Sequence, residues 1–235
     1  MKRLFNACLV FMTILSASCT DRLDNDVTTD TLTDVTFAID VETASLTRAI
    51  SDGTGATQLM WAIFSEDGEL LVKKSVINDA DALISEQGYT LSTKLTKGQT
   101  YKATFWAQNQ NCTAYAVSDE MKVTVDYNGI NNDESRDAFY ATSDVFSVNS
   151  PSIVTVTLRR PFAQVNVGAN EWDVEYAKEA GMEVKTSSAT VKAVPNCINL
   201  FDGSLEGAVD VVYTASAKPE EYLTGDVDRN GEDEV

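Results

Sequence analysis

Histidine is absent from the 235 residues of this chain. Its absence excludes Ser-His-Asp and Cys-His catalysis, and it removes the usual general base and most zinc sites. The patterns Cys-x-x-Cys, Walker A and Gly-x-Gly-x-x-Gly are missing as well, so redox, P-loop and dinucleotide sites have no motif behind them. A glycosidase-like pair of carboxylates stays open because acids are abundant, although nothing marks two of them as partners. We expect no enzymatic activity and no cofactor.

Basic residues are few: 18 Lys and Arg stand against 36 Asp and Glu, which gives a formal net charge of −18 at pH 7. A surface this negative repels phosphate backbones, so we expect no nucleic-acid partner. Aromatic residues are plentiful, with 9 Phe, 8 Tyr and 3 Trp, and a chain of this length can bury a substantial core. The composition therefore predicts a folded, acidic protein.

The N-terminus carries the pattern of an export signal. Leu4–Leu15 follows two basic residues and is mostly apolar, but it is too short to span a bilayer. Small residues directly before Cys19 resemble a bacterial lipobox, although Ser16 stands where the usual motif has Leu. We interpret residues 1–18 as a lipoprotein signal peptide and Cys19 as the acylated first residue of the mature chain. The alternative is an ordinary cleaved signal followed by an incidental cysteine.

Cysteine is scarce, with four in the chain. Cys8 lies within the predicted signal and Cys19 is assigned to the lipid, so Cys112 and Cys197 remain. The bacterial envelope is oxidising and permits a disulfide between them, but two buried thiols explain them equally well. The sequence leaves both alternatives open, since it does not report the separation of the two Cα atoms.

The clearest strand pattern lies around Pro161. Before this proline the apolar residues occupy even positions, and after it they occupy odd ones. Alternation of this kind is typical of half-buried strands, and a slip by one residue moves every side chain to the other face. Proline lacks the N–H that a central strand needs, so we expect two strands joined by a sharp bend. The alternating residues are Val154, Val156 and Leu158, then Ala163, Val165 and Val167.

The remaining chain shows short strand patterns joined by turns. Residues 19–33 are polar and acidic, as in a tether. Asp67-Gly68 between two apolar runs predicts a hairpin, Lys97-Gly98 predicts a second turn, and Asp173–Ala180 predicts a short helix that ends at Gly181. We also expect strands at Val35–Val41, Leu59–Phe64, Glu69–Lys73, Leu91–Leu95, Tyr101–Ala107, Val123–Tyr127, Val184–Ala193 and Val209–Thr214, a short helix within Val76–Glu86, and irregular structure over Asp137–Val148.

About nine or ten strands of this period predict an all-β fold with little helix, built as an antiparallel β-sandwich. We expect an N-terminal β-sandwich domain over residues 34–160 and a second β domain over residues 161–235. The chain ends soon after the polar turn Gly225–Gly231. We therefore expect the second domain to be incomplete.

The same turn matches half of a calcium-binding loop. Asp226, Asp228 and Asn230 are oxygen ligands at alternate positions, and Gly231 follows them. The closing Glu would fall beyond Val235, so the loop lacks a ligand that this type of site needs. An acidic turn is the alternative, and we expect no metal.

Three segments carry a family resemblance: Val156–Gly168 (VTLRRPFAQVNVG), Tyr101–Gln108 (YKATFWAQ) and Arg136–Ala141 (RDAFYA). They resemble the fimbrillin-like lipoproteins, which are related to type V pili, and more narrowly an uncharacterised subgroup of unknown function. The matching residues are packing motifs rather than a chemical site. The resemblance implies a two-domain, transthyretin-like β-sandwich of Greek-key type, exported as a lipoprotein to the cell outer membrane. Relatives continue past Gly225–Gly231 with further strands, which also implies an incomplete second domain.

The resemblance also implies a maturation step. In type V pili an arginine-specific protease cuts such proteins in an N-terminal loop, and removal of the first strand opens a groove for a strand from the next subunit. Arg48-Ala49 stands where such a cut would fall, after Val35–Val41. Loss of that strand would leave an unpaired edge for a donated strand. For Arg48 the alternative is an ordinary exposed linker.

Two functions follow as expectations. The first is a surface structural or adhesive protein (a pilus subunit, tip or anchor), partnered with the outer membrane through its lipid and with other fimbrillin-like subunits by strand exchange. The second is a monomeric, lipid-anchored module that binds a glycan or a host protein. Trp61, Trp106 and Trp172 could supply stacking platforms for the second function, and core packing is the alternative explanation for them.

Overall fold

The computed structural model describes residues 31–42, 55–78, 88–128, 134–162, 171–182 and 188–214. From Leu32 onward, the described residues belong to one compact unit. Within the described ranges the chain has fourteen β-strands, one α-helix and one short 3-10 helix, η1 (Glu134–Arg136). The predicted all-β fold with little helix is confirmed.

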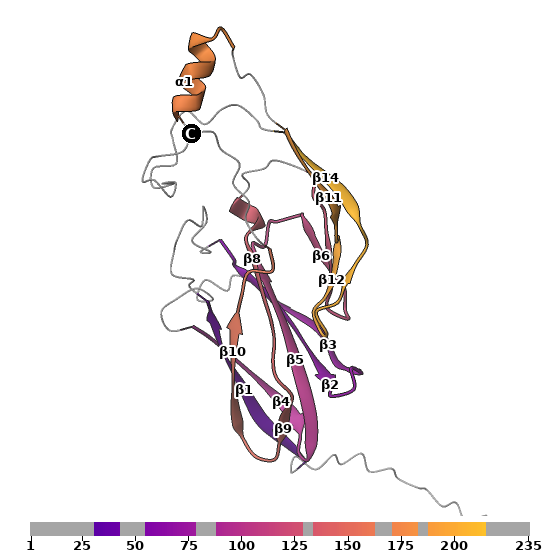
Figure 1. The fold of residues 1–235 in the computed structure, drawn as a ribbon. Helices are drawn as coiled ribbons and strands as arrows, with labels where there is room; N and C mark the ends of the chain where they lie inside the picture. Colours follow the sequence, from indigo (N-terminus) through magenta and orange to yellow (C-terminus); the bar gives the residue numbers. More distant parts are fainter. Residues whose placement is uncertain are drawn as a thin grey trace, which may run out of the picture. The chain divides into compact units, whose positions relative to one another are not determined.

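Sheet A consists of three strands with β1 (Leu32–Val41) in the middle (Figure 1). β1 is antiparallel to β4 (Tyr89–Thr96) and parallel to β10 (Ser152–Leu158). Both β1 and β10 bury alternate residues, as their sequence pattern predicted. The parallel pair was not expected, because the alternation of a strand does not report the direction of its neighbour. The buried residues of these two strands include Val35, Phe37, Ile39, Val156 and Leu158.

The central strands of sheet B are buried on both faces. Six consecutive residues of its strand β2, Leu59–Phe64, are all buried, which a strand achieves only when both sides of its sheet are covered. Its strands, in hydrogen-bonding order, are β3 (Leu70–Ile77), β2 (Gln58–Ser65), β5 (Gln99–Gln108) and β8 (Ala138–Thr142), and β9 (Phe146–Val148) also pairs with β5.

Sheet C and an attached arm are built largely from one long hairpin. Within sheet C, β12 (Cys197–Asn199) pairs with β13 (Leu205–Glu206) and with β7 (Lys122–Val125). The same hairpin continues beyond sheet C as β11 (Ser188–Val194) paired with β14 (Val209–Thr214), with a register shift between Val191 and Val194. The fourth strand of sheet C is β6 (Tyr115–Val117), which pairs with β7.

Two apolar clusters show that the three sheets form layers. One cluster joins sheet A to sheet B and includes Phe37, Leu158, Ile63, Phe105 and Phe139. The other joins the opposite face of sheet B to sheet C and includes Met60, Phe64, Trp106, Val123 and Leu200. The predicted sandwich is therefore present as sheets A and B, and sheet C adds a third layer. Because sheet C takes β7 and β12 from either side of residue 160, it contains strands from both expected domains; the division into two domains stays a prediction.

The turn signals were informative but incomplete. The hairpin at Asp67-Gly68 is confirmed, with the Ser65 N–H donating to the Glu69 carbonyl at 2.9 Å. The turn at Gly98 joins β4 of sheet A to β5 of sheet B, so it is a crossover between sheets.

Helix α1 (Glu171–Glu179) is confirmed, and Gly181 follows it with φ +75°. The region Asp137–Val148, expected to be irregular, contains the short strands β8 and β9. In the region of the expected helix after Val76, strand β3 continues to Ile77, and residues 79–87 lie outside the described ranges. The second strand expected after Pro161 falls in residues 163–170, which also lie outside the described ranges.

The side chain of Tyr115, on strand β6 of sheet C, packs in an aromatic cluster against Trp106 of sheet B. Its ring stacks on Phe162, with centroids 5.7 Å apart and planes 9° apart, and it meets Trp106 edge-on at 5.3 Å. Its hydroxyl donates to the carbonyl of Arg136 at 2.5 Å. Burial, and secondarily the neighbouring Cys112, raises the pKa of Tyr115 well above its ordinary value of 10.0.

This raised pKa predicts a loss of stability at high pH. Above about pH 10 the unfolded chain releases the Tyr115 proton while the folded chain keeps it, so the unfolded state binds fewer protons. The free energy of unfolding should then fall by about 1.4 kcal/mol per pH unit from this residue. Urea denaturation from pH 8 to 11.5 measures the free energy of unfolding of wild type and of Tyr115→Phe. The difference between these two free energies should change only above about pH 10. A constant difference would contradict the assignment.

Candidate functional site

The first candidate site is the position of β1 in sheet A. Val35 and Phe37 are fully buried and Ile39 is 1% exposed, so β1 supplies the middle of the first core cluster. β1 is paired on both sides from Val35 to Ile39. Its C-terminal end is fixed to β10, because the Glu42 N–H donates to the Leu158 carbonyl at 2.8 Å. Without β1, a slot one strand wide would separate β10 from β4.

Gly88 fits closely against the end of β1, and this contact gives a stability prediction. Its φ is +66°, and a Cβ added to it would lie 2.7 Å from the Ile39 carbonyl oxygen and 2.3 Å from Asp40 Oδ1. We expect Gly88→Ala to lower the free energy of unfolding by about 2 kcal/mol. Alanine would be strained at this φ, and its Cβ would be crowded by the backbone of β1.

Gly98 is the matched control for that substitution. It has φ +77°, but no atom lies within 4 Å of an added Cβ, so Gly98→Ala should cost about 1 kcal/mol from conformation alone. Urea denaturation of both variants measures the difference. Equal losses would show that β1 does not constrain Gly88.

The predicted maturation and lipidation residues, Cys19, Arg48 and Ala49, lie outside the described ranges, as does the motif of residues 226–231. Cys112 is buried and Cys197 is half-buried. Both alternatives, a disulfide between them and two buried thiols, stay predictions.

Two of the three tryptophans are core residues. Trp61 belongs to the first apolar cluster and Trp106 to the second, and Trp106 is fully buried. Trp172 on α1 is 56% exposed. Core packing is therefore the correct explanation for Trp61 and Trp106, and neither is a stacking platform.

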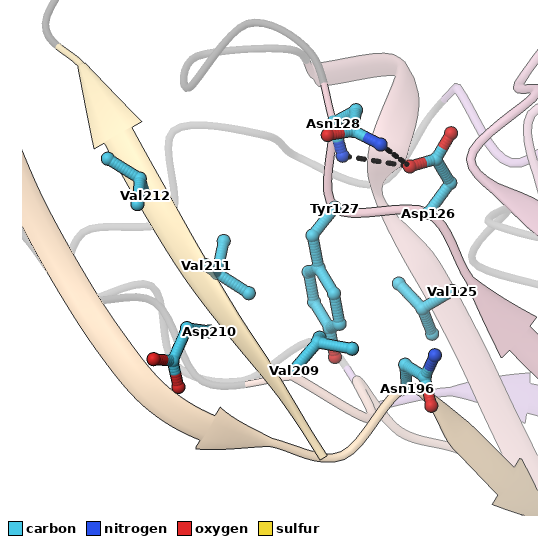
Figure 2. A pocket seen from close by; sticks show the side chains of 9 residues that line it. All are labelled: Val125, Asp126, Tyr127, Asn128, Asn196, Val209, Asp210, Val211 and Val212. Atoms are coloured by element: carbon cyan, nitrogen blue, oxygen red, sulfur yellow. Dashed lines mark hydrogen bonds between the residues drawn. The ribbon is translucent and has the colours of Figure 1, made fainter. Parts of the chain in front are cut away.

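The second candidate site is a groove of about 400 Å³ where the arm of the long hairpin leaves sheet C. Figure 2 shows the Tyr127 ring pointing into the groove, with Val209 and Val211 of β14 on one side and Val125 on the other. Val125 and Val211 are buried, whereas Tyr127, Asn196 and Val209 are half-buried. The exposed residues around the opening are Asp126, Asn128, Asp210 and Val212.

The groove exists because only the inner part of the hairpin pairs with sheet C. The Val125 N–H donates to the Asn196 carbonyl at 2.9 Å. This is the last backbone hydrogen bond between β7 and the hairpin before the arm begins. Beyond it the register shift of the arm includes Ala193, whose φ is +56°. A bulge of this kind bends a strand and increases its twist, so the arm diverges from β7 and leaves the space that Tyr127 enters.

No sequence pattern pointed directly to this groove. The alternation of Val123, Val125 and Tyr127 predicted one continuous strand, but β7 ends at Val125. The available signal was Asp126 followed by Asn128, a pair that often forms a local turn. In the structure Asp126 Oδ1 accepts the Asn128 N–H at 2.9 Å and its Nδ2–H at 2.8 Å.

Across the part of the chain that the structure describes, no group of three or more His, Cys, Asp or Glu side chains could hold a metal ion. In the same part, no helix has the length and apolar character needed to cross a bilayer.

The sequence matches the family of unknown function DUF6562 over residues 27–231. The chain belongs to this family. Membership agrees with the expected subgroup of unknown function. No similar sequence was found among the curated proteins.

Solved structures are similar to this chain at low sequence identity. A candidate polysaccharide-binding protein (DUF1812) from Bacteroides thetaiotaomicron is 13% identical, with a TM-score of 0.57 over 80% of this chain and 67% of that one. A candidate adhesin from Bacteroides ovatus is 12% identical, with a TM-score of 0.50 over 77% and 61%. The fimbrial anchor protein Mfa2 from Porphyromonas gingivalis is 14% identical, with a TM-score of 0.48 over 80% and 68%. The chain therefore spans about two thirds of the length of these proteins.

Proposed function

We propose that this protein is a non-catalytic structural or adhesive component of the cell surface, held in the outer membrane by a lipid on Cys19. In this proposal it is a fimbrillin-like pilus subunit, tip or anchor. The observation that carries the proposal is the place of β1: it is the first strand among the described residues and the middle strand of sheet A, and Arg48 follows it in the sequence. One cut after Arg48 would separate a central strand from the rest of the fold.

The physical consequence of such a cut supports strand exchange. Loss of β1 would expose the hydrogen-bonding edges of β4 and β10, together with the apolar residues that Phe37 and its neighbours cover. An exposed, apolar slot between two strands binds an added strand through backbone hydrogen bonds and side-chain pockets. A strand donated by another subunit would fill it. The likeness in fold to a candidate adhesin adds support at low identity.

The decisive measurement is the mass of the mature N-terminus in protein taken from the outer membrane. We expect a chain that begins at Ala49, and we expect Arg48→Lys to abolish that species, because it keeps the charge but removes the arginine. Wild-type protein that begins only at acylated Cys19 would mean that β1 stays in place, and strand exchange would be wrong.

A second candidate function is a monomeric, lipid-anchored module that binds a glycan or a host protein. The groove beside Tyr127 favours it, since it is open to solvent and combines an aromatic ring with polar groups. The likeness in fold to a candidate polysaccharide-binding protein adds support, again at low identity. This function is compatible with an N-terminus at Cys19, so the same mass measurement separates the two candidates.

A further inference from the structure

We propose that the groove between the end of β7 and β14 binds a sugar unit of a neutral glycan, with Tyr127 as its stacking platform. Its volume of about 400 Å³ lies within the range of about 300–1,000 Å³ that is usual for ligand sites. The proposal deepens the second candidate function and does not depend on strand exchange. It follows from the apolar floor, the polar opening and the charge of the groove.

The Tyr127 ring is held in position before any ligand arrives. Its hydroxyl donates to the Pro195 carbonyl at 2.6 Å, which fixes the far end of the side chain on the hairpin. Partial burial raises the pKa of Tyr127, so the hydroxyl stays a neutral donor to that carbonyl at physiological pH. A ligand therefore meets a ring that does not need to be ordered, which reduces the entropy lost on binding.

The inner surface suits the apolar face of a pyranose ring. The floor is formed by Val125 and Val211, and Val209 stands beside the Tyr127 ring (Figure 2). One face of many pyranoses presents mainly C–H groups, which pack against aromatic and aliphatic surfaces and leave the hydroxyls at the edge of the sugar. Aromatic side chains with a fixed polar end are well suited to such half-wet contacts.

The opening supplies hydrogen-bonding groups for those hydroxyls. Asp126 and Asp210 provide carboxylate acceptors, and Asn128 and Asn196 provide carboxamides, which can both donate and accept. The segment that carries Asp126 and Asn128 is held in place by Arg136. Arg136 Nη1 donates to the Asp126 carbonyl at 3.2 Å, and Nη2 donates to the Asn128 carbonyl. Asp210 is fixed too, since its Oδ1 accepts the Ala193 N–H at 3.1 Å.

The charge of the groove selects neutral over acidic sugars. Two carboxylates lie at its opening, and no Lys or Arg is among its described lining residues. The guanidinium of Arg136 lies behind the loop, where it bonds to backbone carbonyls. Sialylated, sulfated or phosphorylated glycans would meet these carboxylates in a protein of net charge −18.

The experiment is an array of immobilised neutral, sialylated and sulfated oligosaccharides, probed with the purified full chain. We expect wild type to bind neutral glycans, and Tyr127→Ala to weaken binding about tenfold through loss of the ring contact. Tyr127→Phe keeps the ring and should bind within about threefold of wild type. Trp172→Ala is the matched aromatic control and should bind as wild type, because Trp172 does not line the groove.

A second measurement needs no variant and covers the case in which Tyr127→Ala does not fold. With the neutral oligosaccharide that binds best on the array, the amide NMR signals of Asp126, Asn128 and Val211 should shift in wild-type protein, and that of Trp172 should not. Binding to acidic glycans alone, the absence of glycan binding, or shifts confined to α1 would overturn the proposal. A mature N-terminus at Ala49 with no glycan binding would refute this groove and leave strand exchange standing.

Discussion

Trp106→Ala should lower the free energy of unfolding by about 3–5 kcal/mol, the largest effect that we expect from a single substitution in this chain. Trp106 is fully buried on the side of sheet B that faces sheet C. Its indole N–H donates to Gln108 Oε1 at 2.7 Å, and Gln108 is itself buried. The substitution would create a cavity between two sheets and leave a buried carboxamide oxygen without its donor, and both changes are costly.

Trp172→Ala is the matched control for this prediction. The side chain of Trp172 is 56% exposed on α1, so its removal should change the free energy of unfolding by less than about 1 kcal/mol. Guanidinium denaturation followed by circular dichroism measures both variants without relying on tryptophan fluorescence. Similar losses for the two variants would contradict the layered arrangement, because they would mean that Trp106 is no better packed than an exposed side chain.

The sequence was sufficient to predict the strands with one buried face. In β1 and β10 apolar residues alternate with polar ones, and the structure buries most of the alternating apolar residues and half-buries Val41 and Val154. The reason is physical: a strand with a single covered face needs apolar side chains at every second position only. The predicted hairpin at Gly68 and the helix before Gly181 were correct for a similarly local reason, since turn and cap conformations depend on one or two residues.

The third layer could not be predicted in the same way. On β5, Tyr101, Ala103 and Phe105 share one face, and Thr104 and Gln108 are polar residues of the opposite face. Thr104 and Gln108 are nevertheless buried. This face of β5 is covered by sheet C. One of the covering strands, β12, has only three residues and is distant from β5 in the sequence. No local pattern reports a contact of that range.

The candidate sites show the same limit. The sequence identified β1 as a strand before an arginine-containing loop, but only the pairing with β4 and β10 shows that it is the middle strand. The groove depends on the positive φ of Ala193, and alanine is not a residue that signals this conformation. Tyr127 was predicted to continue a strand, and its role in the groove follows from the arm leaving sheet C. Single-residue signals were available for turns, including the turn of Asp126 and Asn128 after β7, whereas the divergence of the arm from β7 had none.

The consecutive residues Arg159 and Arg160 provide the second large prediction, because they have opposite roles at the end of β10. The backbone of Arg159 bridges to Tyr140 of β8, which joins the edge of sheet A to sheet B, and its side chain is 69% exposed beside Glu42. The side chain of Arg160 points inward instead. Its Nε and Nη2 each lie 2.8 Å from an oxygen of Asp137, and its guanidinium lies 5.0 Å from the Phe139 ring centroid.

Arg160→Ala should therefore lower the free energy of unfolding by about 3 kcal/mol, because it leaves the carboxylate of Asp137, whose side chain is only 9% exposed, without its bidentate partner. Arg159→Ala removes the same type of residue from an exposed ion pair and should cost about 0.5 kcal/mol. Urea denaturation of the two variants, with Asp137→Ala and the Asp137→Ala/Arg160→Ala double variant, completes a thermodynamic cycle. We expect the double variant to lose less than the sum of its singles, since removing both charges leaves neither buried alone. Additive losses, or equal losses for the two arginines, would mean that the pair does not hold β10 against β8, and the closure of sheet A onto sheet B would then rest on the Arg159–Tyr140 backbone bridge and apolar packing alone.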